Sequence, residues 1–129
     1  MATLFSKIVA GEIPCYKVDE NADFLAFLDI NPLTKGHVLV IPKIEIDSIF
    51  DIEDDLLGKM MIFSKKVAHK IKTAFPCTKV GVTVIGLEVP HAHVHLIPIN
   101  SLSDMNFSSS KLTLAPAELE QIATKIREI

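Results

Sequence analysis

Short runs of apolar residues, separated by polar breaks, predict five strands in this chain. Runs of four to eight apolar or alternating residues bounded by Gly, Pro, Asn or Asp are typical of strands. The breaks here are Asn21, Pro42, Gly86 and Pro90. The predicted strands cover residues 16–19, 24–28, 37–41, 79–85 and 91–99.

Helical spacing of apolar residues predicts one long helix, one C-terminal helix and a short helix near the N-terminus. The long helix is expected to have Asp51 as its N-cap and to end before Pro76. Pro116 is expected to open the C-terminal helix. The short helix covers 4–9 and stops at Gly11. The inner faces of the two larger helices are Leu56, Met60, Phe63, Val67 and Ile71, and Leu119, Ile122, Ala123 and Ile126.

Five strands with few helices, in an order without regular strand–helix–strand alternation, favour an α+β fold with an antiparallel sheet. A length of 129 residues predicts one domain, residues 1–129. Its core is expected over 4–98, followed by a C-terminal loop and helix over 101–129. Residues 101–110 are polar and serine-rich, and a mobile loop is expected there.

Charge and composition exclude several classes of partner. A net charge of −3 provides no basic surface for a nucleic-acid backbone. No apolar stretch approaches the roughly 18 residues that span a membrane, so no membrane partner is expected. Cys15 and Cys77 form no Cys-x-x-Cys pattern. They are expected to be free thiols in a reducing compartment, which predicts a cytoplasmic protein.

Three histidines alternate with apolar residues near the end of the predicted sheet. Because strand side chains alternate between faces, His91, His93 and His95 are expected to point to one side of the last strand. Histidine changes charge near neutral pH, so such a row suggests proton transfer, nucleophilic attack or metal ligation. Three imidazoles also suit zinc with an open fourth position. The spacing alone does not decide between these roles, and metal binding is one of them.

Four segments together resemble the histidine triad proteins, a family of nucleotide-binding hydrolases and transferases. The triad matches the family's defining motif, and the other three segments occur in the family's order. They are 4–14, similar to its N-terminal signature, 24–32, similar to its ribose-binding segment, and 36–43, similar to its central strand. The resemblance implies a HIT-like domain whose five-stranded sheet continues across a homodimer.

The resemblance also implies a reaction. A neutral imidazole nitrogen can attack phosphorus and divide one displacement into two easier steps. His93 would attack the α-phosphorus, His95 would donate to the α-phosphate, and His91 would brace the end of the row. His37 would face the same site from an adjacent strand. The reaction would release AMP or GMP from a phosphoramidate, a dinucleoside polyphosphate or a related conjugate, with no cofactor.

The implied nucleotide pocket combines apolar side chains with one carboxylate. Asp29 would receive both ribose hydroxyls, because an ionised carboxylate accepts hydrogen bonds and cannot donate. The alternative for Asp29 is a turn-forming role before Asn31 and Pro32. For the apolar residues the alternative is core packing, since a purine pocket uses the same residue types. The apolar residues implied to hold the purine are Phe5, Ile8, Phe27, Leu28 and Ile30.

The sequence departs from the family pattern before the triad. Leu87 follows Gly86 where many members have glutamine, and Glu88 replaces a small hydroxyl residue. Backbone N–H groups near Gly86 and Glu88 are still expected to hold the phosphate. Thr83 lies near the place of an expected asparagine. These departures affect the leaving group and the rate rather than the fold.

No metal is expected near the N-terminus or at the histidine row. Some bacterial members bind a structural zinc through Cys-x-x-Cys, but Thr3 and Ser6 stand at those positions. The family uses its histidine row without metal. Two alternatives to the hydrolase remain: a nucleotide-binding regulatory protein with little turnover, and a metalloenzyme that uses the three histidines as ligands.

Overall fold

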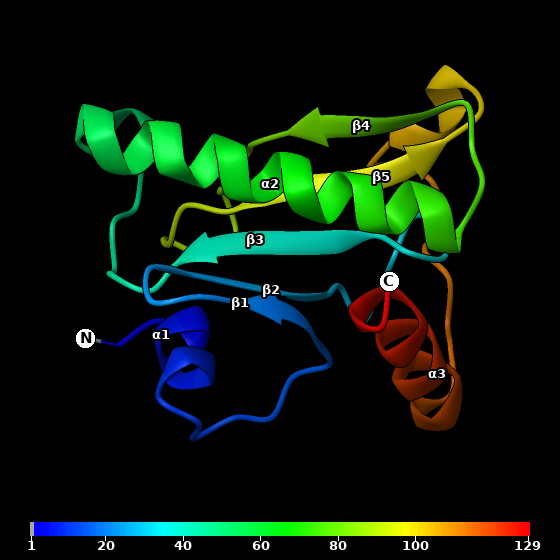
Figure 1. Cartoon of the computed structure of the whole chain (residues 1–129), viewed down its shortest axis with the longest axis horizontal. Coiled ribbons are helices and arrows are strands. Elements are labelled where there is room, and N and C mark those ends of the chain that lie inside the picture. The colour runs from blue at the N-terminus through cyan, green and yellow to red at the C-terminus, as the bar shows by residue number, and fades with distance from the viewer. Residues whose placement is uncertain (1) are drawn as a thin grey trace.

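Five antiparallel strands form one sheet in the computed structural model, which describes residues 2–129 (Figure 1). The strands are β1 Lys17–Glu20, β2 Phe24–Leu28, β3 Val38–Pro42, β4 Lys79–Thr83 and β5 Val94–Ile99. Their order across the sheet is β1-β2-β3-β5-β4. The α-helices are α1 Leu4–Val9, α2 Asp54–Ala74 and α3 Pro116–Arg127. The predicted α+β fold with a five-stranded antiparallel sheet is confirmed.

The last strand begins later than the sequence predicts. Strand β5 starts at Val94, so His91 and His93 lie in the turn before it. The β3–β5 pairing stops at Val40 opposite Val94. Beyond that pair, proline at position 42 has no N–H to donate, and Ala92 N donates instead to Ile46 O at 2.7 Å. The expectation that one strand carries all three histidines is therefore wrong.

The long helix also begins later than predicted. Asp51 is the last residue of a short 3-10 helix, and Glu53 is the N-cap of α2. The carboxylate of Glu53 accepts a hydrogen bond from Leu56 N at 2.7 Å and so satisfies one of the free N–H groups of the first turn. The end of α2 at Ala74 matches the predicted stop before Pro76.

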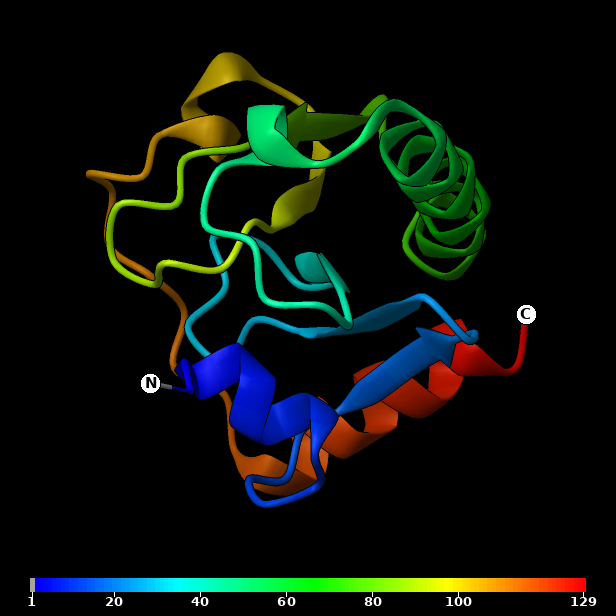
Figure 2. The same ribbon diagram turned by 90° about the vertical axis from the view of Figure 1, so that its left-hand side faces the viewer.

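Helices α2 and α3 bury the main core against one face of the sheet, with α2 seen nearly end-on in Figure 2. Ala92, Val94 and Leu96 belong to this core, so the apolar half of the predicted alternation is confirmed. The opposite face carries a smaller cluster, in which Phe5 of α1 packs with apolar residues of β2 and β3. This second face is the one that the histidines share.

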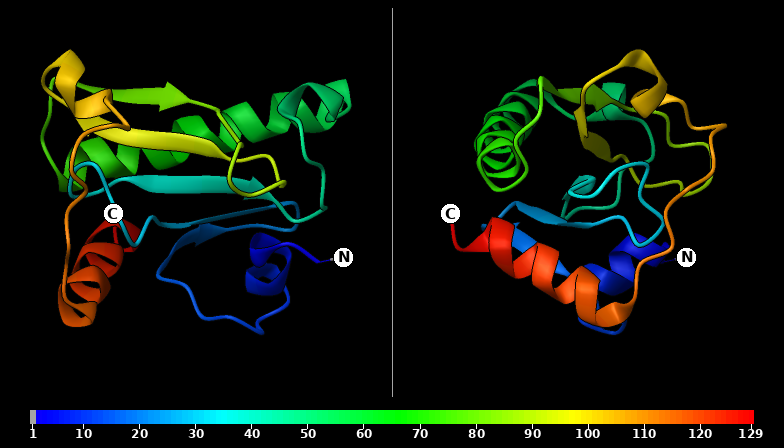
Figure 3. Two further views of the ribbon diagram at one scale, coloured as in Figure 1. Left: turned by 180° about the vertical axis from the view of Figure 1, so that it is seen from behind. Right: turned by 90° about the vertical axis from the view of Figure 1, so that its right-hand side faces the viewer.

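The segment after β5 folds back across the end of the sheet. Residues Leu102–Met105 form a short 3-10 helix, and Asp104 Oδ2 accepts from Asn100 N at 2.8 Å. Leu112 N then donates to Pro32 O at 2.9 Å. Figure 3 (left) shows this segment descending along one side of the molecule to α3. Among residues 2–129, no helix combines the length and the apolar character that crossing a bilayer requires.

Candidate active site

The histidines meet where β3 and β5 lie side by side. His95 is on β5, His37 directly precedes β3, and His91 and His93 lie in the turn before β5. All four are buried, and His93 and His95 keep 7% of their surface exposed. The ring centroids of His93 and His95 are 4.9 Å apart. These two rings therefore present their outer edges to the same small region of space.

The hydrogen bonds of His93 fix which of its nitrogens carries the proton. Nδ1 lies 2.8 Å from the backbone oxygen of His91, and a carbonyl oxygen only accepts. Neutral His93 therefore carries its proton on Nδ1 and its lone pair on Nε2. Nε2 makes no hydrogen bond within residues 2–129. The Phe5 ring packs against the imidazole of His93 in a T-shaped arrangement, with a centroid distance of 4.9 Å.

A second chain of hydrogen bonds fixes the tautomers of His37 and His95. Leu33 N donates to Nδ1 of His37 at 3.1 Å, so the proton of His37 is on Nε2. That Nε2–H donates to Nδ1 of His95 at 3.0 Å. The proton of His95 is consequently on Nε2. His95 is therefore a hydrogen-bond donor next to the free lone pair of His93.

Burial keeps these imidazoles neutral. Desolvation, followed by the nearby His95, lowers the pKa of His37 to about 3. Desolvation, followed by the nearby His93, lowers the pKa of His95 to about 4. Desolvation also lowers the pKa of His93, although its hydrogen bond to the His91 carbonyl partly opposes the shift. At neutral pH the lone pair on His93 is therefore available for attack.

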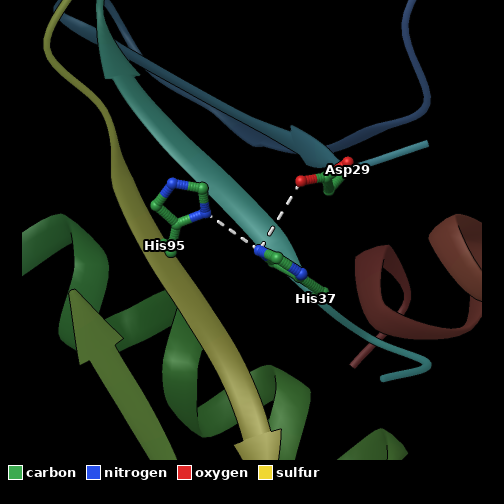
Figure 4. A group of neighbouring side chains, drawn as sticks. All are labelled: Asp29, His37 and His95. Atoms are coloured by element: carbon green, nitrogen blue, oxygen red, sulfur yellow. Dashed lines mark hydrogen bonds and ion pairs between the residues drawn. The ribbon is translucent and has the colours of Figure 1, made fainter. Parts of the chain in front are cut away.

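Asp29 has one oxygen in a turn and the other near His37. Oδ1 accepts from Asn31 N at 2.9 Å, which is the turn-forming role considered from the sequence. Oδ2 lies 3.7 Å from Nε2 of His37, too far for a good hydrogen bond (Figure 4). Burial raises the pKa of Asp29, and the hydrogen bond from Asn31 opposes this shift. One carboxylate oxygen thus remains for a ligand.

Within residues 2–129, Asp29, His37 and His95 also form a group of side chains that is close enough together to hold a metal ion. One ligand atom from each lies within 4.8 Å of the others. The Leu33 N–H that points at Nδ1 of His37 argues against a metal here, because it keeps the His37 proton on Nε2. Nε2 then has no lone pair to offer. The hydrogen bonds suit proton donation better than metal ligation.

Two cavities meet at the histidines. The apolar one has a volume of about 330 Å³ and the polar one about 230 Å³. His93, His95, Asp29 and Glu88 line both. Phe5 and Phe27 line the apolar cavity while being buried themselves, so they serve core packing and cavity wall together. All the apolar residues expected around a purine line this cavity: Phe5, Ile8, Phe27, Leu28 and Ile30.

The loop before the triad forms one wall of the polar cavity. Gly86 and Leu87 line it together with Glu88. Gly86 has a φ of 75°, a left-handed conformation that favours glycine. Leu87 is 90% exposed and adds no polar group to the cavity. The anionic Glu88 is thus the polar side chain that this loop contributes.

Three expected site residues, His37, His91 and Thr83, lie outside the cavities. Thr83 pairs with His95 across β4 and β5 but lines neither cavity. His91 lies behind His93, with Nε2 at 2.8 Å from Pro42 O. The structure therefore brings His37 and His91 to the site as support. It places Thr83 beside His95 but in the wall of neither cavity.

The sequence interpretation missed two residues from the segment after β5. The Phe107 ring meets the His95 ring edge-on at a centroid distance of 5.0 Å. Lys111 lines the polar cavity and donates to Phe107 O at 3.0 Å. Phe107 is the one aromatic residue between positions 101 and 110, which is the only signal the sequence offered. Its contact with His95 depends on how the segment folds back.

Comparison with known proteins identifies the family of this chain. The sequence pattern of the HIT domain matches residues 10–102. The chain belongs to the HIT domain family. It is 34% identical over 133 residues to an adenosine 5'-monophosphoramidase of Schizosaccharomyces pombe, which covers 98% of this chain and 100% of that protein. It is 36% identical over 134 residues to the protein hit of Bacillus subtilis, covering 95% and 90%.

A solved structure extends this likeness to the whole fold. The crystal structure of a Hit-like protein from Bartonella henselae matches this HIT domain with a TM-score of 0.83 at 32% identity. The match covers 98% of this chain and 95% of the other. The sheet and its helices are therefore those of the HIT family.

Proposed function

We propose that this HIT protein is a nucleotide-binding hydrolase that cleaves purine nucleotides at the α-phosphorus through a nucleotidyl-His93 intermediate. The observation that carries the proposal is the pairing of two tautomers. His93 has a free lone pair on Nε2, and its neighbour His95 offers an Nε2–H. A nucleophile beside a hydrogen-bond donor is the arrangement that displacement at phosphorus requires.

The two steps follow from these atoms. In the first, Nε2 of His93 forms a bond to the α-phosphorus while the bond from phosphorus to the leaving group breaks, and an amine leaving group takes up a proton from the solvent. Nε2–H of His95 donates to a non-bridging oxygen and stabilises the charge that develops there. In the second step, water attacks the phosphorus and loses a proton to the solvent, the bond to Nε2 breaks, and the nucleoside monophosphate leaves. His93 regains its lone pair, so the cycle is closed.

The cavities suit the two ends of such a substrate. We assign the purine to the apolar cavity and the ribose hydroxyls to the free oxygen of Asp29. The phosphate would lie against His93 and His95, near the backbone of Gly86 and Glu88. The leaving group would then occupy the polar cavity. An apolar sandwich accepts adenine and guanine alike, so AMP and GMP conjugates are both expected substrates.

The relative from Schizosaccharomyces pombe is named an adenosine 5'-monophosphoramidase, which supports a phosphoramidate as the first substrate to test. Glu88 agrees with this choice, because a carboxylate favours an amine-bearing leaving group over an anionic one. Leu87 supports the second candidate, a nucleotide-binding protein with little turnover. It supplies no polar contact to the leaving group.

We also propose a homodimer formed through β4. Arg127 of α3 donates to Lys17 O at the outer side of β1, so one carbonyl of that edge already has a partner within the chain. Strand β4 is the other edge, and its Val82 is half-exposed. Ile85 and Phe50 line a hollow beside the end of β4. Pairing of two β4 strands would cover this apolar edge and join two sheets.

Residues 1–129 would then act as one HIT-like domain in each subunit. The free thiols of Cys15 and Cys77 agree with the expected cytoplasmic location.

Sedimentation of Val82→Lys beside the wild type tests the dimer, since a charge on each paired edge should produce monomers.

The test of the reaction is AMP release from adenosine 5'-phosphoramidate. We expect the wild type to turn over with and without a chelator, and His93→Ala to lose at least about a thousandfold in rate, or roughly 4 kcal/mol of transition-state stabilisation. Binding of AMP without turnover by the wild type would favour the regulatory protein. Activity that the chelator abolishes would favour the metalloenzyme.

A further inference from the structure

The start of the N-terminal helix is hydrogen-bonded to the turn that carries the histidines. Thr3 Oγ1 lies 3.1 Å from Nδ1 of His91. Glu45 Oε1 accepts from Thr3 N at 2.9 Å and from the Ser6 hydroxyl at 2.5 Å. Three segments distant in sequence thus meet at one point. We call Thr3, Ser6 and Glu45 the N-terminal brace.

The proton on each atom of this contact can be assigned. Nε2 of His91 lies 2.8 Å from Pro42 O, so the proton of neutral His91 is on Nε2. Nδ1 is then an acceptor, and the Thr3 hydroxyl is its donor at 3.1 Å. The same hydroxyl lies 3.2 Å from Ser6 Oγ, so its one proton is shared between these two acceptors. The Ser6 hydroxyl uses its proton on Glu45. These hydrogen bonds, that of Ser6 first and that of Thr3 N second, lower the pKa of Glu45 and keep it ionised.

The brace reaches the nucleophile through His91. The backbone oxygen of His91 accepts the Nδ1–H of His93, and this bond fixes the tautomer that leaves Nε2 free. Phe5, in the same helix as Ser6, contacts both the His91 and His93 rings. Movement of α1 or of the His91 ring therefore changes the direction in which Nε2 of His93 points.

We propose that Thr3 is a positioning residue for His93, supported by Ser6 and Glu45. Thr3 lines neither cavity, so it touches no substrate. Thr3 binds the His91 ring directly. It also caps α1, the helix whose Phe5 contacts the same ring. His91 in turn aligns His93 for attack. The part of the inference that concerns turnover rests on the proposed function.

The test compares Thr3→Val with Thr3→Ser. Valine keeps the shape but removes the hydroxyl, whereas serine retains both its proton and its helix-capping oxygen. Thr3→Val should lower kcat about fivefold to tenfold, the effect of one ordinary hydrogen bond, while KM and AMP affinity stay within about twofold. Thr3→Ser should match the wild type. Thr73→Val is the control, because it removes an exposed hydroxyl bond to His69 O on α2.

A second measurement follows the imidazoles themselves. In protein with ¹⁵N-labelled histidine, Thr3→Val should shift the Nδ1 signal of His91 toward that of a free acceptor nitrogen and move the Nδ1–H signal of His93. Thr3→Ser and Thr73→Val should leave both signals in place. This readout needs no turnover, so it tests the brace even if the wild type proves to be inactive.

Two results would overturn the inference. In one, Thr3→Val leaves the histidine signals and kcat unchanged. In the other, Thr3→Val lowers kcat, AMP affinity and the melting temperature together without moving the His93 signal, which is the behaviour of a helix cap alone. Inactive wild type with shifted His91 and His93 signals in Thr3→Val would refute the hydrolase and support the brace.

Discussion

His37 should determine whether His95 can donate to the phosphate. In His37→Phe the ring shape is kept, but the Nε2–H that serves Nδ1 of His95 is lost. His95 is then free to place its proton on Nδ1, which leaves a lone pair on Nε2 facing an anionic phosphate. His37→Gln keeps an N–H near the original position and should preserve the productive tautomer.

The magnitude follows from the burial of this hydrogen bond. His37 is 1% exposed, so removing its hydrogen bond leaves Nδ1 of His95 buried without a partner. A buried group without a partner costs about 1–3 kcal/mol. Converted to a rate, kcat should fall by roughly tenfold to a hundredfold. This is less than the loss of about a hundredfold to a thousandfold expected when a donor to the reacting oxygens is removed altogether. The unpaired Leu33 N–H should also lower the free energy of unfolding by about 1–3 kcal/mol.

The assay is steady-state AMP release by the wild type, His37→Phe, His37→Gln and the control His69→Gln, whose side chain is exposed on α2. Urea unfolding of each variant shows that the folded fraction is full under assay conditions. We expect His37→Gln to recover most of the rate. A His37→Phe enzyme that is folded and within twofold of the wild-type kcat would refute the tautomer argument.

Two further predictions concern charge. Because His37 and His95 stay neutral in the folded protein down to pKa values of about 3 and about 4, while the unfolded chain binds protons near 6.5, stability present above pH 6.5 should be lost as pH falls. The loss of unfolding free energy should be on the order of 1 kcal/mol per pH unit for each histidine between pH 6 and 5. Urea unfolding of His37→Phe should show a weaker dependence of the unfolding free energy on pH. The raised pKa of Asp29 acts in the opposite sense. Asp29→Asn should weaken AMP binding about tenfold in calorimetry but leave 2',3'-dideoxy-AMP nearly unchanged, and equal losses for both ligands would argue against the ribose role.

Most of the fold follows from local sequence patterns, namely the spacing of apolar residues and the positions of helix-starting and strand-ending residues. Strand β2 occupies the predicted residues, and α3 begins at Pro116 with its predicted inner face buried. The misplaced boundaries have local physical causes. Glu53 replaces Asp51 as the cap of α2. Because Pro42 has no N–H, the pairing of β3 with β5 extends only to Val94 and does not include His91.

The site is harder to predict because its chemistry depends on contacts between distant segments. Residue spacing indicated that His93 and His95 would be neighbours, but the tautomers depend on the backbone of Leu33 and the carbonyl of His91. Lys111 reaches the polar cavity only because the chain folds back after β5. No periodicity in the sequence encodes such a return.

The most direct test of the central claim is mass spectrometry of the protein quenched in acid-free conditions during turnover of adenosine 5'-phosphoramidate. The account predicts an adenylyl adduct on the peptide that contains His93, at the ring nitrogen and on no other histidine. The adduct should be absent from His93→Ala and should accumulate without any added metal. Full turnover by His93→Ala, or an adduct on a different residue, would contradict the account.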